Sequence, residues 1–328
     1  MPEPLLLGLD LRASYRLRLG EVKAVDGVDI EIPRDSIVGL AGESGCGKST
    51  LINVLLANIR PPLVLKSGRI LLDGLEILGI SREEVRKKVW GVKVSIVPQS
   101  ALNALNPTKR IIELVKDAIR QHTPASDQEI ISLCKRRFEE LNLPFDSVYK
   151  YPHELSGGMR QRVIIAISTL LNPRLLVVDE PTSALDVSTQ KQVLKMMVDM
   201  KKEGIIDSIL FVTHELPVLR QVASHIYIMY AGKIVEYGPA DSVFFRPLHP
   251  YTKALMYSVM TPEPESRARG LVTIPGEPPS LLMPPQGCRF HPRCPYVMDV
   301  CKKSEPRLVP LSDERGVACF LHHGESVN

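Results

Sequence analysis

The sequence predicts an α/β fold with a parallel sheet, a helical insertion and a small C-terminal domain. The clearest observation is the segment Gly42 to Thr50, which fits the phosphate-loop pattern G-x-x-x-x-G-K-S/T. An apolar run over 36–41 predicts a buried parallel strand directly before this loop, and a second run over 51–59 predicts a helix directly after it. A third apolar run, 175–178, ends in the acidic pair Asp179 and Glu180. The strand-loop-helix context predicts that the loop binds the phosphates of a nucleoside triphosphate.

The residue types of this loop suit phosphate binding. Glycines allow successive backbone N–H groups to turn toward one anion, the lysine reaches the β- and γ-phosphates, and Ser49 offers a hydroxyl to Mg²⁺. A glycine-rich turn without a ligand is the alternative, and the flanking strand and helix patterns disfavour it. The predicted nucleotide-binding residues of the loop are Gly42, Ser44, Gly45, Cys46, Gly47, Lys48, Ser49 and Thr50.

Later segments narrow the class of enzyme. Leu155 to Arg162 (LSGGMRQR) resembles the signature of ATP-binding cassette (ABC) ATPases, and LLVVDE resembles the strand that carries their acidic pair. Gln99 after SIVP, the segment 183–186 (SALD) and His214 after ILFVT follow in the order typical of that family. The resemblance implies a P-loop NTPase fold of the ABC nucleotide-binding type, with an α-helical subdomain.

The same resemblance implies roles for single residues. Asp179 supports Mg²⁺ together with Ser49, and Gln99 contacts metal and water. Glu180 polarises the attacking water, and His214 contacts the γ-phosphate. Tyr15 is placed as the aromatic that stacks on adenine. For Tyr15 the alternative is a half-buried tyrosine with a structural role only.

Chemistry supports an acidic pair in this position. Phosphoryl transfer requires a protein to position water and neutralise spreading negative charge. Consecutive residues at the end of a strand point to opposite faces, so we expect Asp179 to serve the metal and Glu180 the water. A solvated turn that begins with two acids is the alternative.

The signature segment forms a second predicted anion site. Ser156, Gly157 and Gly158 stand at a predicted helix start, and Asp186 is assigned to the same nucleotide-binding set. In ABC ATPases the signature of one subunit closes over nucleotide held by its partner. The chain carries one phosphate loop and one signature, so the resemblance implies a head-to-tail pair with an identical or homologous second ATPase.

Composition agrees with a globular protein of more than one domain. The chain has 328 residues, of which 44% are hydrophobic and 24% charged. No apolar stretch reaches the ~18 residues that span a bilayer, and no N-terminal leader pattern is present. A net charge of +4 with interspersed signs disfavours a nucleic-acid surface. Pattern shifts predict a nucleotide-binding domain over 1–240, with its helical subdomain at about 100–170, and a C-terminal domain over 241–328.

The proline-rich C-terminal segments HPYTKAL and GCRFHPRCP resemble the C-terminal region of the oligopeptide/dipeptide subfamily of ABC importers. This region holds Cys288, Cys294, Cys301 and Cys319, with spacings of 5, 6 and 17 residues. The close C-x2-4-C pairs of structural zinc sites are absent from these spacings. By resemblance we expect a 4Fe-4S cluster on the four thiolates, with zinc, free thiols or disulfides as alternatives.

These observations predict the ATP-hydrolysing subunit of a peptide-type importer, peripheral on the cytoplasmic side of the cell membrane. Its implied partners are the second ATPase, two membrane permease subunits and, indirectly, an external solute-binding protein, with no nucleic acid. One alternative is an oligosaccharide importer of the same subfamily. The alternative from another class is a soluble ABC ATPase without a transport role.

Overall fold

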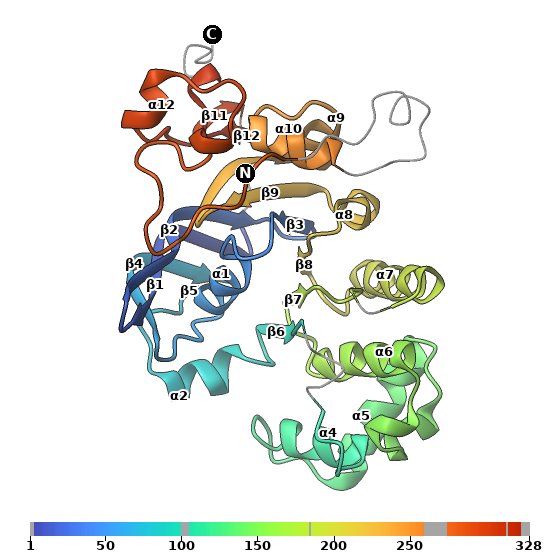
Figure 1. The fold of residues 1–328 in the computed structure, drawn as a ribbon. Helices are drawn as coiled ribbons and strands as arrows, with labels where there is room; N and C mark the ends of the chain where they lie inside the picture. Colours follow the sequence, from blue (N-terminus) through green and yellow to red (C-terminus); the bar gives the residue numbers. More distant parts are fainter. Residues whose placement is uncertain (1–2, 100–104, 184, 259–273, 313, 323–328) are drawn as a thin grey trace.

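The computed structural model describes residues 3–99, 105–183, 185–258, 274–312 and 314–322. Two sheets and several helices are arranged so that the nucleotide-loop segment lies near the middle, the helical insertion at one end and the C-terminal region at the other (Figure 1). Residues 100–104 of the SALNALNPT loop, and Ala184 of the SALD segment, lie outside the described residues.

The large sheet has eight strands in the order β11-β12-β10-β9-β3-β8-β7-β6. The strands from β9 to β6 are parallel, and β10, β11 and β12 run antiparallel to their neighbours. Continuous apolar runs are typical of strands covered on both faces, and β3, β7 and β8 are buried throughout. The parallel strands are β3 (Ile37–Ala41), β6 (Val94–Val97), β7 (Leu175–Asp179), β8 (Ser208–Val212) and β9 (His225–Tyr230).

A second sheet of four antiparallel strands has the order β2-β1-β4-β5. Helix α1 (Lys48–Leu55) follows β3 and packs against β1 and β2. Its buried side chains Leu51 and Val54 belong to the same apolar core as strands of both sheets. The helix predicted over 51–59 therefore begins three residues earlier, at Lys48, and ends at Leu55. The strands are β1 (Leu6–Leu17), β2 (Gly20–Ile32), β4 (Leu63–Leu72) and β5 (Leu75–Glu76).

Helices cover the other side of the large sheet and form the insertion. Helices α7 (Val187–Lys202) and α8 (Leu216–Val222) follow β7 and β8, whereas α4, α5 and α6 gather at the lower right of Figure 1. The buried interior of this helical group includes Val115, Phe138 and Val163. The remaining helices are α2 (Arg82–Glu84) with a further turn over Val85–Val89, α4 (Ile111–Ile119), α5 (Asp127–Glu140) and α6 (Gly157–Ser168), with short turns at Phe145–Tyr149 and Pro152–Glu154.

The C-terminal region is joined to the large sheet by strand pairing. Strand β12 (Arg315–Val317) pairs with β10 (Lys233–Pro239), and β11 (Val309–Ser312) pairs with β12. One sheet thus crosses residue 240, where the sequence predicts a domain boundary. The other elements of this region are α9 (Ala240–Phe245), α10 (Pro250–Tyr257), α12 (Asp299–Lys303) and short turns at His291–Arg293 and Phe320–His322.

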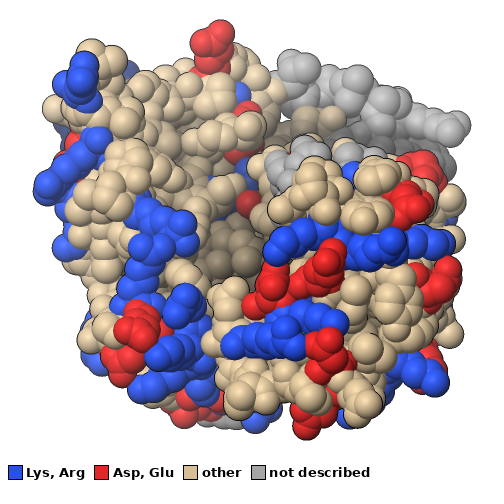
Figure 2. Space-filling model, turned by 90° about the horizontal axis from the view of Figure 1, so that it is seen from below, with Lys and Arg blue, Asp and Glu red and all other residues tan. Residues whose placement is uncertain are grey.

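Within the described residues, no helix combines the length and apolarity required to cross a bilayer. The face seen from below carries Lys and Arg side chains interspersed with Asp and Glu, and it is hollowed near its centre (Figure 2).

Candidate functional site

The phosphate loop connects the carboxyl end of β3 to the start of α1. Gly42 and Gly47 adopt φ values of 156° and 113°. A Cβ at either glycine would lie 2.1 Å from a backbone oxygen, that of Met229 or that of Ala24 respectively. Any side chain at these positions would therefore displace the loop from the strands on which it rests.

Lys48 is held inside the loop. Its Nζ donates to the backbone oxygens of Gly42 (2.7 Å) and Glu43 (3.0 Å), and the residue is 7% exposed. The Cys46 side chain is buried in the core, so this residue contributes to the phosphate loop through its backbone groups. Ser44 and Gly45 are exposed at the tip of the loop. A buried ammonium group beside N–H groups of a helix start is suited to an anionic ligand.

Ser49 and Asp179 lie together at the next point of the site. The Ser49 hydroxyl donates to Asp179 Oδ2 at 3.1 Å. Burial raises the pKa of Asp179, and neighbouring Glu180 adds to this effect, while the bond from Ser49 opposes it. A hydroxyl and a carboxylate are oxygen ligands of the kind Mg²⁺ prefers, and a bound divalent cation would favour the ionised form of the carboxylate.

Glu180 lies between the other two predicted catalytic residues. Gln99 Nε2 donates to its Oε2 at 2.8 Å, and His214 Nδ1 lies 2.8 Å from its Oε1. The three residues follow β6, β7 and β8, which are neighbours in the sheet. Parallel strands bring their carboxyl ends to one edge, so this convergence follows from the topology.

The two carboxylates diverge for a reason that differs from the expected strand alternation. Strand β7 ends at Asp179, and Glu180 adopts φ 50°, a left-handed conformation that costs energy for a residue with a side chain. The Glu180 N–H donates to Val212 O at 2.8 Å and fixes this turn. The left-handed turn, and not the pleat of the strand, sends Glu180 toward Gln99 and His214.

Tyr15 in β1 reaches the helix that follows the loop. Its hydroxyl lies 3.1 Å from Thr50 Oγ1. This contact brings the predicted adenine-stacking residue next to the loop, and the stacking role stays a prediction.

The signature segment starts another helix. Ser156 caps α6 by accepting a hydrogen bond from the Met159 N–H at 3.3 Å. Gly158 lies against α7, since a Cβ there would be 2.2 Å from Thr189 Cγ2. Figure 1 shows α6 well apart from α1, beyond β6 and β7. The signature and the phosphate loop of one chain are therefore separate surfaces.

Asp186 caps the neighbouring helix α7. Its carboxylate accepts hydrogen bonds from the backbone N–H and hydroxyl groups of Ser188 and Thr189. These bonds lower the pKa of Asp186. The residue thus has a structural role at a helix start, and its contact with nucleotide stays a prediction.

The four C-terminal cysteines line one small pocket with His249, Phe290 and His291. All six cysteines of the chain are free thiols, which is contrary to the disulfide alternative. In the described part of the chain, no group of three or more His, Cys, Asp or Glu side chains has the arrangement that would hold one metal ion. Burial raises the pKa of Cys288 and of Cys319 to about 11. Thiolates in this pocket would therefore require a compensating positive charge.

Three residues around the loop have no role in the predictions from sequence. Glu43 lies in the loop, and Tyr251 and Arg293 of the C-terminal region both contact it. The motifs HPYTKAL and GCRFHPRCP contain the tyrosine and the arginine. In the sequence, the one sign that Tyr251 and Arg293 have a specific role is that these polar residues occur inside the two C-terminal motifs.

Comparisons with known proteins agree with this geometry. Residues 25–183 match the family model described as ABC transporter, and residues 235–301 match that of the oligopeptide/dipeptide transporter C-terminal region. The chain is 42% identical to a dipeptide transport ATP-binding protein, DppD, of Caldanaerobacter subterraneus, over 95% of both chains. It is 38% identical to the oligopeptide transport ATP-binding protein OppD of Bacillus subtilis, over 97% of this chain and 88% of that protein. Among solved structures, the dimeric ATP-binding cassette MJ0796 bound to ADP and Pi matches with a TM-score of 0.63 at 24% identity, over 72% of this chain and 98% of that chain.

Proposed function

The chain belongs to the ABC transporter family of ATP-hydrolysing subunits, and on that premise we propose that it powers the import of dipeptides or oligopeptides. The family follows from the match over 25–183 and from relatives of 36–42% identity over most of the chain. The proposed solute class is supported by the C-terminal match over 235–301 and by the names of those relatives. That same match disfavours the alternative of a soluble ABC ATPase without a transport role.

The observation that carries the catalytic proposal is the position of Glu180 between Gln99 and His214. Hydrolysis requires a carboxylate that orients water in line with the γ-phosphate. Glu180 would accept a hydrogen bond from that water, while Gln99 and His214 restrict where its two oxygens point. Lys48 and the loop N–H groups would bind the phosphate oxygens.

Ser49 and Asp179 would hold the Mg²⁺ that accompanies ATP. Their oxygens are already adjacent, at 3.1 Å, at the start of α1 and the end of β7. The ion would supply positive charge that offsets the phosphate charges.

We further propose that two such subunits act together and drive membrane permeases. The separation of α6 from α1 in one chain supports a composite site, in which Ser156, Gly157 and Gly158 serve the neighbour's nucleotide. We place the permease docking surface on the face shown in Figure 2, which is hollowed near its centre. This arrangement corresponds to a subunit that is peripheral on the cytoplasmic side of the membrane and drives two permease subunits, to which an external binding protein delivers solute.

The experiment replaces Glu180 with Gln in the assembled transporter. We expect ATP to bind and remain trapped, with turnover reduced ~100-fold or more, because the amide cannot orient and polarise the water in the same way. Glu203→Gln, at the exposed end of α7, is the matched control and leaves turnover unchanged. Unchanged hydrolysis by Glu180→Gln would remove Glu180 from its assigned role.

For the C-terminal pocket we propose a 4Fe-4S cluster on Cys288, Cys294, Cys301 and Cys319. Support comes from the lining of one pocket by all four thiols. A single zinc ion requires its ligands to meet at one point with Zn–S distances of about 2.3 Å, and the described side chains do not form such a group. A cluster holds its four cysteines farther apart, around a larger core.

Protein purified without oxygen provides the test of this cluster. Brown protein with broad visible absorption and bound iron and sulfide supports the proposal, and Cys301→Ser would reduce the iron content. Colourless protein with stoichiometric zinc, or with no metal, contradicts it and leaves the ATPase assignment intact.

A further inference from the structure

Glu43 of the phosphate loop is held by two side chains from the C-terminal region. The Glu43 N–H donates to the Tyr251 hydroxyl at 2.9 Å. The Arg293 guanidinium donates to both carboxylate oxygens of Glu43, with distances of 2.8 and 3.0 Å. A bidentate pair of this kind fixes direction as well as distance.

The arginine is itself rigidly held. Its side chain is 5% exposed, its Nε donates to Pro275 O at 2.8 Å, and its Nη1 donates to the Tyr230 hydroxyl at 3.3 Å. Tyr230, Tyr251 and Phe290 pack as a buried aromatic group beside it, with ring centroids 4.5–5.5 Å apart. A guanidinium with so few alternative positions can restrain the loop residue that it binds.

We propose that Arg293 and Tyr251 are positioning residues for the phosphate loop. They hold Glu43 so that the loop is formed before ATP arrives, which makes nucleotide affinity depend on the C-terminal region. The inference rests on the proposed ATP-hydrolysing function and deepens it, because it assigns a nucleotide-site role to residues outside the cassette motifs.

The contact affects the atoms that would meet phosphate. Glu43 O is one of the two carbonyls to which Lys48 donates. The Glu43 N–H is directed at Tyr251, so it is not among the N–H groups left for the phosphates. Fixing both the backbone N–H and the carboxylate of Glu43 therefore sets the place of the Lys48 head.

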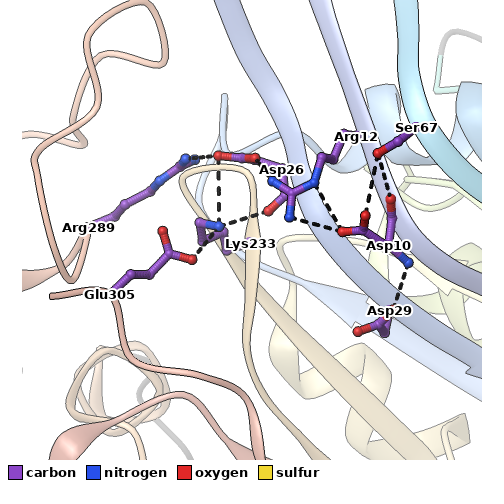
Figure 3. Close-up of polar contacts among 8 residues, drawn as sticks. All are labelled: Asp10, Arg12, Asp26, Asp29, Ser67, Lys233, Arg289 and Glu305. Carbon is purple, nitrogen blue, oxygen red and sulfur yellow. Dashed lines mark hydrogen bonds and ion pairs between the residues drawn. The ribbon is translucent and has the colours of Figure 1, made fainter.

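A second attachment from the same short loop supports this role. Arg289 pairs with Asp26 (Figure 3). It also donates to Ala231 O at 2.5 Å. The next residue, Gly232, donates its N–H to Cys46 O of the phosphate loop at 2.7 Å. Arg293 thus binds the phosphate loop directly at Glu43, whereas Arg289 supports it indirectly, through the turn at Ala231 and Gly232 that binds Cys46.

Asp26 is the carboxylate around which the basic side chains of this second attachment lie. Arg12 binds it at 2.6 Å, and Lys233 lies 3.8 Å from its carboxylate and 2.5 Å from Glu305 (Figure 3). Burial by itself raises the pKa of Asp26, but Lys233, Arg289 and Arg12 outweigh that effect and lower it. The ionised carboxylate therefore anchors the segment that carries Arg289 to β2 and β10.

The experiment measures the Kd of a fluorescent ATP analogue with Mg²⁺ for the full chain. We expect Arg293→Met and Tyr251→Phe each to raise Kd roughly tenfold, since a loop that must order itself on binding loses affinity. Arg293→Lys should restore part of the affinity, because it keeps the charge and loses the bidentate geometry. In the double variant Glu43→Gln, Arg293→Met, the loss of binding free energy should be smaller than the sum of the losses in the two single variants.

Arg315→Met is the matched control. Arg315 is also a poorly exposed arginine that joins the C-terminal region to the core, through Glu236, but it has no contact with the phosphate loop. It should lower the melting temperature with less than a twofold change in Kd. If Arg293→Met and Tyr251→Phe change Kd no more than Arg315→Met does, the positioning role is wrong. If the unmodified chain binds no ATP, the proposed function itself fails.

Discussion

The nucleotide end of the large sheet and the C-terminal cysteine region organise their side chains in different ways. Gln99, Glu180 and His214 converge because they follow three neighbouring parallel strands. Three of the four cysteines instead lie in loops and the fourth, Cys301, in the short helix α12, and buried arginines and aromatic rings attach this region to the core. A site at strand ends takes its geometry from the sheet, whereas a site on loops depends on tertiary anchors.

This difference predicts that ATP turnover and the stability of the C-terminal region can be lost independently of each other. Changes at the sheet edge should abolish ATP turnover and leave the fold intact, whereas changes in the anchors should loosen the C-terminal region first.

The largest effect is expected from Lys48→Met. Removing the buried ammonium group should reduce ATP affinity and turnover ~100-fold or more, because Lys48 is the one basic residue within the loop over 42–50. Binding and hydrolysis assays measure the loss. Lys302→Met, on the exposed face of α12, is the control and should behave as the unmodified protein. Retained turnover in Lys48→Met would contradict the assignment of catalysis to the sheet edge.

Phe290→Ala tests the anchors of the cysteine region. Phe290 is 2% exposed and packs against Tyr230, Tyr251 and His249. We expect a loss of about 3–5 kcal/mol in the free energy of unfolding, because the change leaves a cavity in the aromatic group. Urea unfolding gives the value. Met283→Ala, at an 80% exposed side chain, should cost less than about 0.5 kcal/mol, and equal losses for the two variants would refute the anchoring role.

A smaller effect is expected from pH through His249. Burial lowers the pKa of His249 to about 3, and its Nδ1 accepts a hydrogen bond from the Tyr251 N–H. The unfolded chain binds a proton near pH 6.5, whereas the folded chain does not, so stability is full above that pH and falls as pH drops toward 3. The slope from this group approaches about 1.4 kcal/mol per pH unit.

His249→Asn should remove that component of the slope, since Asn can still accept the hydrogen bond at the helix start and does not titrate. Unfolding free energies measured between pH 7 and pH 4 provide the comparison. His153→Asn, at an exposed position, should leave the slope as it is. A variant His249→Asn with the original pH dependence would assign the effect to other groups.

Much of the nucleotide site is predictable because local patterns determine it. The glycine spacing of the phosphate loop, the apolar run before Asp179 and the helix after the loop all depend on near neighbours in the sequence. The position of the Glu180 side chain is harder to predict from the sequence. Its left-handed φ of 50° depends on a backbone hydrogen bond to Val212 in the next strand.

The sequence by itself determined the fold class, the phosphate loop and the family, since motifs and periodicity are local properties of the chain. Only the tertiary structure decided which distant groups meet. Glu43 contacts Tyr251 and Arg293 across separations of 208 and 250 residues. Residue spacing in the sequence does not predict contacts over such separations, because they depend on how the C-terminal region packs against the sheet.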